Sequence, residues 1–199
     1  MTRQAPTGER GRRRSKRSHQ AIISATRELL VERGYSDVTI EGIAARAGVG
    51  KQTIYRWWPS RAALVLEAYL SSADVVTTPP AARTVGEDIR ALLGWLIAVL
   101  REPTGGHVVA GLVADIQHDA DLAEGFHRDV VPARREAMLA ALERGRDRGE
   151  IRIDADLELA VDALHGAVFY RLLLSGEALD GDFAARLADH VLDGLASRS

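Results

Sequence analysis

The chain has 199 residues, of which 46% are hydrophobic and 27% charged, a composition ordinary for a globular protein of one or two domains. It contains no cysteine, which excludes disulfides, thiol redox sensing and zinc–cysteine sites. The net charge of −2 conceals a division: residues 1–60 hold 12 basic and 5 acidic side chains, and the remainder holds 14 and 23. This asymmetry indicates that the N-terminal part binds a polyanion; the alternative is a solvated basic tail, because seven of the twelve basic residues fall before Ser18.

Polar and basic residues dominate the first 20 positions, where a secretory signal would need an apolar stretch. The longest apolar stretches, IRALLGWLIAVL and VDALHGAVFYRLLL, are interrupted and too short to span a bilayer comfortably. We therefore expect a cytoplasmic protein that does not enter the membrane.

Helical signals begin after residues 1–16, which lack an apolar period and are expected to be a disordered basic arm. A first helix is predicted from about Arg17, where apolar residues recur at helical spacing, and Gly34 ends it. A second helix follows Thr39, whose hydroxyl can cap the amides of the first turn. A third, short helix follows the glycine-containing turn 48–50, and two short helices joined in this way form the helix-turn-helix pattern.

The third helix, predicted over 51–58, presents two different sides. Ile54 and Trp58 fall on the side that must pack against the first two helices. Trp57 lies at the border, where its indole N–H could reach a phosphate, although a core position for Trp57 fits the pattern equally well. The outward side carries polar and basic residues, namely Lys51, Gln52, Tyr55 and Arg56, with Thr53 at its flank.

Beyond the Pro59-Ser60 break, the pattern stays helical to the end of the chain, and no convincing strand is found. The clearest linker is SSADVVTTPPAAR, residues 71–83. Helices are predicted from Arg61 to about Leu70 and over 85–101, 105–118, 121–148, 155–175 and 182–196. The expected fold is all-α, with a helix-turn-helix domain over 17–60 and a second helical domain over 61–199.

The last two predicted helices carry more apolar residues than one face of each can bury. Monomers rarely leave such surfaces bare, so the pattern favours a homodimer over a covered internal core. The candidate interface residues are Leu164, Val168, Leu172, Leu187, Val191 and Leu195.

Catalytic and metal-binding patterns are not found in the sequence. There is no glycine-rich phosphate loop, nucleophile elbow or carboxylate pair placed for acid–base work, so neither enzyme activity nor a cofactor is expected. His118 and His127 lie among acidic residues but lack metal-ligand spacing, so no metal site is expected. Candidates to line a small-molecule pocket are chosen by residue type alone, and each is also explained as ordinary core: Trp95, His107, Phe126, Met138, His165 and Phe169.

One part of the chain, SHQAIISATRELLVERGYSDVTIEGIAARAGVGKQTIYRWWPSRAAL, resembles the N-terminal domain of the TetR/AcrR transcriptional repressors. The landmarks are Gly34-Tyr35, Thr39 followed by Ile43-Ala44, Ala47-Gly48-Val49, the element Thr-Ile-Tyr-Arg-Trp-Trp over 53–58, and Arg61. The resemblance covers about 18–66, roughly a quarter of the chain. The remainder is similar to the family's helical ligand-binding and dimerisation domain only in length and helix number.

The resemblance implies contacts with double-stranded DNA at defined positions. Residues near base edges or adjacent phosphates would be Lys51, Gln52, Thr53 and Tyr55. Residues facing the phosphate backbone would be Arg56, Trp57, Thr39 and Arg61. The Trp57-Trp58 pair departs from the more usual Tyr-Phe or His-Phe, and the basic segment before the first helix is longer than the fold needs.

Together these features predict a DNA-binding transcriptional regulator, most simply a repressor. As a homodimer it would bind a palindromic operator, and a small-molecule effector would release it. In the major groove, Lys51 could reach guanine, Gln52 could bond adenine, and the Thr53 methyl could touch thymine. A non-specific DNA-coating protein and a helical enzyme are the alternatives, and an activator or a regulator without an effector also remains open.

Overall fold

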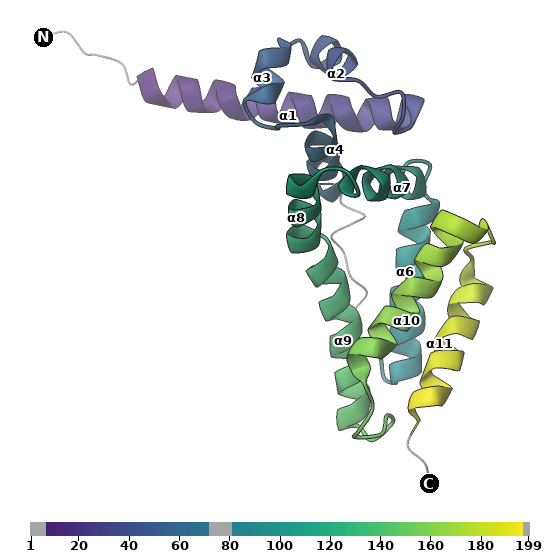
Figure 1. Cartoon of the computed structure of the whole chain (residues 1–199). Coiled ribbons are helices and arrows are strands. Elements are labelled where there is room, and N and C mark those ends of the chain that lie inside the picture. The colour runs from purple at the N-terminus through teal and green to yellow at the C-terminus, as the bar shows by residue number, and fades with distance from the viewer. Residues whose placement is uncertain (1–6, 72–80, 197–199) are drawn as a thin grey trace, which may run out of the picture. The chain divides into compact units, whose positions relative to one another are not determined.

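The computed structural model describes residues 7–71 and 81–196, with side chains from Ser15 onward, and the regular elements in these ranges are helices (Figure 1). The expected all-α fold is confirmed. The chain divides into two compact units, residues 1–72 and 73–199. Most of the predicted linker lies outside the described residues.

The N-terminal unit contains α1 (Thr7–Arg33), α2 (Ile40–Ala47), α3 (Lys51–Tyr55) and α4 (Arg61–Leu70). α1 packs against α2 and α4, and α2 packs against α3. Each helix contributes at least one fully buried apolar side chain to a shared core, and these include Ile22, Leu29, Ile43, Ile54 and Leu64. Because Ile54 anchors α3 in this core, the opposite side of α3 is directed outward.

α1 begins at Thr7, earlier than the predicted start at Arg17. Most of the disordered arm expected over 1–16 is therefore helical, and its first six residues lie outside the described part of the chain. Arginine, lysine and glutamate have high helix propensity, so they favour a helix here although this segment has no apolar face. Helical periodicity of apolar residues could not reveal this extension.

Local signals determine most helix ends in this unit. Gly34 and Gly48 end α1 and α2 with φ of 75° and 65°, in the left-handed region that glycine adopts without steric cost. The predicted cap at Thr39 is confirmed, since its hydroxyl oxygen accepts a hydrogen bond from the Gly42 N–H at 3.1 Å.

The second unit begins with α6 (Val85–Arg101), α7 (Gly105–Ile116) and α8 (Ala120–Asp129). It continues with α9 (Val131–Asp147), α10 (Leu157–Tyr170), the π-helical turn η1 (Arg171–Ser175) and α11 (Gly181–Leu195). α6 packs against α7, α9 and α11. At its first turn the buried Asp88 accepts hydrogen bonds from the Ala82 N–H at 2.6 Å and from Arg144 of α9 at 3.1 Å.

The single helix predicted over 121–148 is wrong, because the structure has α8 and α9 there. Pro132 lies in the first turn of α9. Proline lacks an amide hydrogen and disfavours helical geometry in the preceding residue, so it fits the start of a helix but not its interior. The predicted third helix is also shorter than expected, since α3 ends at Tyr55.

No single helix among the described residues is long and apolar enough to cross a membrane. α6 and α7 meet the same length and composition criteria only as a pair bent by 85°.

Candidate nucleic-acid interface

The exposed side of α3 presents the polar residues expected from the sequence. Lys51, Gln52 and Arg56 are exposed, and Tyr55 exposes 54% of its surface. Thr53 is half-buried at the flank. This arrangement projects donors, acceptors and an aromatic hydroxyl from one short helix, as reading a DNA groove requires.

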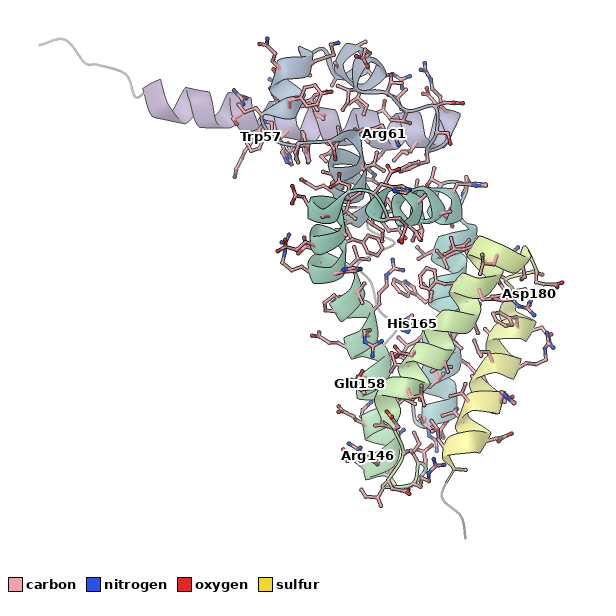
Figure 2. All side chains as sticks on the ribbon, in the orientation of Figure 1. Trp57, Arg61, Arg146, Glu158, His165 and Asp180 are labelled. Atoms are coloured by element: carbon pink, nitrogen blue, oxygen red, sulfur yellow. The ribbon has the colours of Figure 1, made fainter. Side chains whose placement is uncertain are left out.

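The two adjacent tryptophans have different environments. Trp58 is 3% exposed and belongs to the core, as predicted. Trp57, which is labelled in Figure 2, is 43% exposed. The Trp58 indole N–H donates to Glu67 Oε2 of α4 at 2.7 Å. His19 of α1 pairs with the other oxygen of Glu67 at 2.9 Å and lies against both indole rings, with centroids 5.1 Å from Trp57 and 4.8 Å from Trp58.

His19 and Glu67 were not identified from the sequence. A buried tryptophan N–H needs an acceptor, and Glu67 is the acidic residue within the apolar α4. That requirement is the only sequence signal for this contact, and it does not specify the partner. Together these residues connect the end of α3 to α1 and α4.

Arg61, expected at a phosphate, has structural contacts that the sequence did not predict. Its guanidinium donates to the carbonyl oxygens of Tyr35 at 2.6 Å and Val38 at 3.4 Å, and lies 4.4 Å from the Tyr35 ring centroid. Arg61 therefore holds the loop that leads into Thr39 and α2.

Lys51 forms an ion pair at the start of α3. Its ammonium donates to Glu41 Oε1 of α2 at 2.8 Å. The hydrogen bond from Lys51 lowers the pKa of Glu41, and the same bond raises the pKa of Lys51. Both groups are therefore charged at neutral pH.

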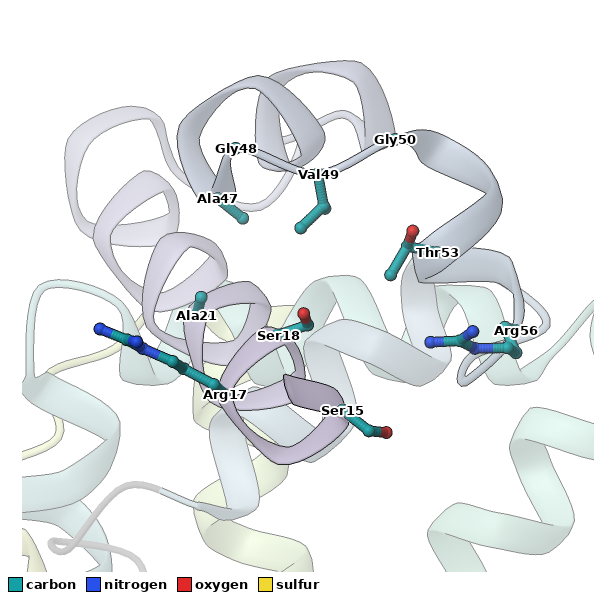
Figure 3. A pocket seen from close by; sticks show the side chains of 10 residues that line it. All are labelled: Ser15, Arg17, Ser18, Ala21, Ala47, Gly48, Val49, Gly50, Thr53 and Arg56. Carbon is teal, nitrogen blue, oxygen red and sulfur yellow. The ribbon is translucent and has the colours of Figure 1, made fainter. Parts of the chain in front are cut away.

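A groove of about 800 Å³ lies between α1 and the α2–α3 turn (Figure 3). Figure 3 shows the Arg56 guanidinium directed toward α1 across the groove and the Arg17 side chain directed away from it. Small residues form most of the lining, which consists of Ser15, Arg17, Ser18, Ala21, Ala47, Gly48, Val49, Gly50, Thr53 and Arg56. The Arg56 guanidinium and several hydroxyl groups make this groove suitable for an anionic strand.

The candidate pocket residues differ in exposure. His107 is exposed and Met138 is buried, whereas Trp95, Phe126, His165 and Phe169 are half-buried. The Arg134 guanidinium of α9 lies 6.0 Å from the Trp95 ring centroid, and the His165 Nδ1 lies 3.0 Å from the Val161 carbonyl oxygen. Burial lowers the pKa of His165, and the charges of Arg134 and Arg135 act in the same direction.

Three of the six candidate dimer residues are buried within their own unit. Leu164 and Val168 are 0% exposed and Leu195 is 8% exposed, so their place in an intersubunit surface is wrong. Leu172, Leu187 and Val191 are half-buried. The exposed apolar side of α10 and η1 instead carries Leu159, Ala163, Gly166, Tyr170 and Leu174.

Among the described residues, no group of three or more His, Cys, Asp or Glu side chains could hold a metal ion.

Comparison with known proteins gives matches along most of the chain. Residues 22–68 match the family model "Bacterial regulatory proteins, tetR family", and residues 79–191 match "Tetracyclin repressor-like, C-terminal domain". The chain is 34% identical over 194 residues to the uncharacterised HTH-type transcriptional regulator YdeS of Bacillus subtilis (strain 168), covering 96% of each.

Two further proteins are similar over most of their length. The DNA-binding transcriptional repressor TetR of Mycobacteroides abscessus is 31% identical over 176 residues, which cover 86% of this chain and 90% of that one. The crystal structure of the TetR family transcription regulator SCO0332 superposes with a TM-score of 0.74 at 34% identity, covering 90% of this chain and 99% of that one.

Proposed function

Because the chain belongs to the TetR family of helix-turn-helix transcriptional regulators, we propose that it represses transcription by binding a palindromic operator as a homodimer and leaves the DNA when a small-molecule effector binds. The observation that carries this proposal is the outward side of α3, where Lys51, Gln52 and Tyr55 are exposed while Ile54 anchors the helix in the core.

In this proposal α3 enters the major groove. Lys51 donates to guanine O6 or N7, Gln52 bonds adenine, and the Thr53 methyl contacts thymine. Tyr55 lies one helical turn after Lys51, where its hydroxyl reaches a base edge or an adjacent phosphate. These contacts supply sequence preference, whereas the basic N-terminal part supplies affinity through release of counterions.

Phosphate contacts come from residues around α3. Arg56 and the exposed edge of Trp57 face one strand, and the groove beside Arg56 accommodates the backbone. The Thr39 hydroxyl accepts from Gly42 and donates its own hydrogen to a phosphate. We assign Arg61 an indirect part, in which it holds the loop before Thr39 through its bonds to Tyr35 and Val38.

The homodimer is proposed to form through α10, η1 and α11. Leu159, Tyr170 and Leu174 expose 64%, 58% and 78% of their surfaces on one side of α10 and η1. Ala163 and Gly166 lie between them on that side and permit close approach of a second copy. Two copies would present two α3 helices to half-sites about one helical turn apart, roughly 34–36 Å.

An effector site is proposed within the second unit. Trp95 and Met138 lie on α6 and α9, and His165 and Phe169 lie on α10. Half-buried aromatic and imidazole groups provide apolar area and a hydrogen-bonding group, as ligand sites commonly do. Phe126 and His107 complete the proposed set. An effector acts by binding more tightly to the conformation that does not fit DNA.

The test begins with the full-length protein and sheared DNA from the source genome. Bound fragments should share a palindrome, and the protein should bind it at least about 1,000-fold more tightly than a random duplex at physiological salt. Equal binding to both duplexes would favour the DNA-coating alternative.

Variants of α3 then test the residues. Lys51→Ala and Gln52→Ala should each weaken binding to the selected fragment about 10- to 100-fold, because a base contact contributes about 1–3 kcal/mol. Arg146→Ala, on α9 of the other unit, is the control and should leave the dissociation constant unchanged. Undiminished binding by both α3 variants would contradict the proposal.

A further inference from the structure

The ion pair between Glu41 and Lys51 joins two exposed side chains from the two helices of the helix-turn-helix. Lys51 is the first residue of α3, and Glu41 lies in the first turn of α2. The Lys51 ammonium and the Glu41 carboxylate are 2.8 Å apart, and the side chains are 54% exposed for Lys51 and 67% exposed for Glu41. The carboxylate of Glu41 therefore lies beside the first residue of the helix that we place in the major groove.

A carboxylate at this place is unfavourable for binding DNA in general. It repels phosphates and holds the Lys51 ammonium that would otherwise pair with one. Acidic side chains in the first turn stabilise a helix such as α2, but any exposed first-turn position would serve that purpose. Helix stabilisation therefore does not explain why the acidic residue stands at the position that contacts Lys51.

The chemistry of the pair matches the major-groove edge of a G·C base pair. Guanine presents two acceptors there, O6 and N7, and cytosine presents the N4 amino group as a donor. Lys51 supplies a donor and Glu41 an acceptor side by side. Because the pair is neutral overall, it can recognise this edge without raising affinity for the phosphate backbone.

We propose that Glu41 is a specificity-determining residue that accepts a hydrogen bond from cytosine N4 while Lys51 donates to guanine of the same or the adjacent base pair in each half-site. The inference rests on the proposed function, because it requires α3 in the major groove. On unrelated DNA the carboxylate keeps Lys51 from a phosphate, so Glu41 also weakens non-specific binding.

Two effects are expected of Glu41→Gln. The preference for G·C should relax at one position of each half-site, because an amide can donate as well as accept and no longer favours cytosine. Binding to a random duplex should tighten severalfold. A plot of the logarithm of the binding constant for random duplex against the logarithm of the salt concentration should also become steeper. The slope should change by up to about 0.9 per protomer, the value for one added phosphate contact.

The experiment is selection from a random-sequence duplex library with full-length protein, followed by sequencing. Wild type, Glu41→Gln, Lys51→Gln and the control Glu32→Gln are compared. Glu32 also pairs with a basic residue of α2, Arg46, at 2.7 Å and is similarly exposed, and Arg46 keeps Glu28 as a second partner. The control therefore removes one equal charge from the same unit without touching Lys51.

Glu41→Gln and Lys51→Gln should relax the selected sequence at the same or adjacent base pairs, and Glu32→Gln should retain the wild-type sequence. The inference is overturned if Glu41→Gln selects the wild-type sequence unchanged, or if the two variants relax positions more than one base pair apart. If wild type itself selects no palindrome, the proposed function fails and this inference fails with it.

Discussion

At the scale of single residues, burial separates two chemically identical neighbours. Trp58 fills the core between α1 and α4 and donates its N–H to Glu67, whereas Trp57 remains at the surface. The same side chain thus contributes to stability at one position and is available to DNA at the next.

Trp58→Phe should lower the free energy of unfolding by about 1–3 kcal/mol, because a hydrogen bond to a charged acceptor is lost along with some packing area. Urea unfolding followed by circular dichroism measures this. Trp57→Phe is the matched control and should change stability by less than about 0.5 kcal/mol while weakening DNA binding. Equal destabilisation by both variants would contradict the assignment.

Acidification is expected to act through His165, whose pKa is lowered mainly by burial. Its ordinary value is about 6.5, so below this pH the unfolded chain binds a proton that the folded chain resists. Stability contributed by neutral His165 is present above pH 6.5 and is lost as the pH falls through the lowered folded pKa.

The stability of wild type should therefore drop between pH 7 and pH 5 by more than that of His165→Gln, which has no titrating group. Urea unfolding at several pH values provides the comparison. Identical pH profiles for the two proteins would rule out this contribution.

At the scale of elements, glycines and a proline determine where helices end and how closely they pack. Pro132 separates α8 from α9, and Gly48 ends α2 before the turn that leads to α3. Gly105 permits the close approach of α7 to the end of α6, because a Cβ there would lie 1.9 Å from the Val99 carbonyl oxygen.

Gly105→Ala should destabilise the second unit by about 3 kcal/mol or more, since the obstructing atoms are backbone and cannot move away. Gly94→Ala is the contrasting variant, because Gly94 is inside α6 and, apart from its chain neighbours and the nearby backbone of α6 itself, no described atom lies within 4 Å of the added Cβ. It should stabilise the protein by about 0.5–1 kcal/mol through helix propensity. Thermal unfolding of both variants tests the pair, and a neutral Gly105→Ala would show that the two helices can separate without cost.

At the scale of the whole molecule, DNA binding and assembly are assigned to different units. The basic N-terminal unit carries α3, and the second unit carries the exposed apolar side of α10 and η1. The proposed dimer is needed because one small helix-turn-helix unit has few base contacts, and two copies bind one palindrome together.

Leu159→Glu should convert the dimer to a monomer, because a carboxylate at this position would be buried without a partner in the interface. Size-exclusion chromatography with light scattering measures the mass, and affinity for the selected palindrome should fall at least tenfold. Val31→Glu, at an exposed apolar position of α1, should remain dimeric. A dimeric Leu159→Glu would place the interface elsewhere.

Local sequence signals were sufficient to predict the helix-turn-helix, its helix ends at Gly34 and Gly48, the cap at Thr39 and the outward polar side of α3. These features depend on residues within a few positions of one another, through backbone conformation and the helical repeat. The helical N-terminal extension was missed because charged residues give no apolar period, and the break at Pro132 was missed although its signal is local.

Contacts between separate segments of the chain follow from tertiary packing and have no local signal in the sequence. The contact of Lys51 with Glu41 joins two helices, and the contacts of Trp58 with Glu67 and of Arg61 with Tyr35 each join a helix to a loop. Tertiary packing also decided which apolar residues of α10 are covered, so that Leu164 is buried and Leu159 is not. A helix with apolar residues nearly all round has no intrinsic inner face, and the neighbouring helices alone select the side that water can reach.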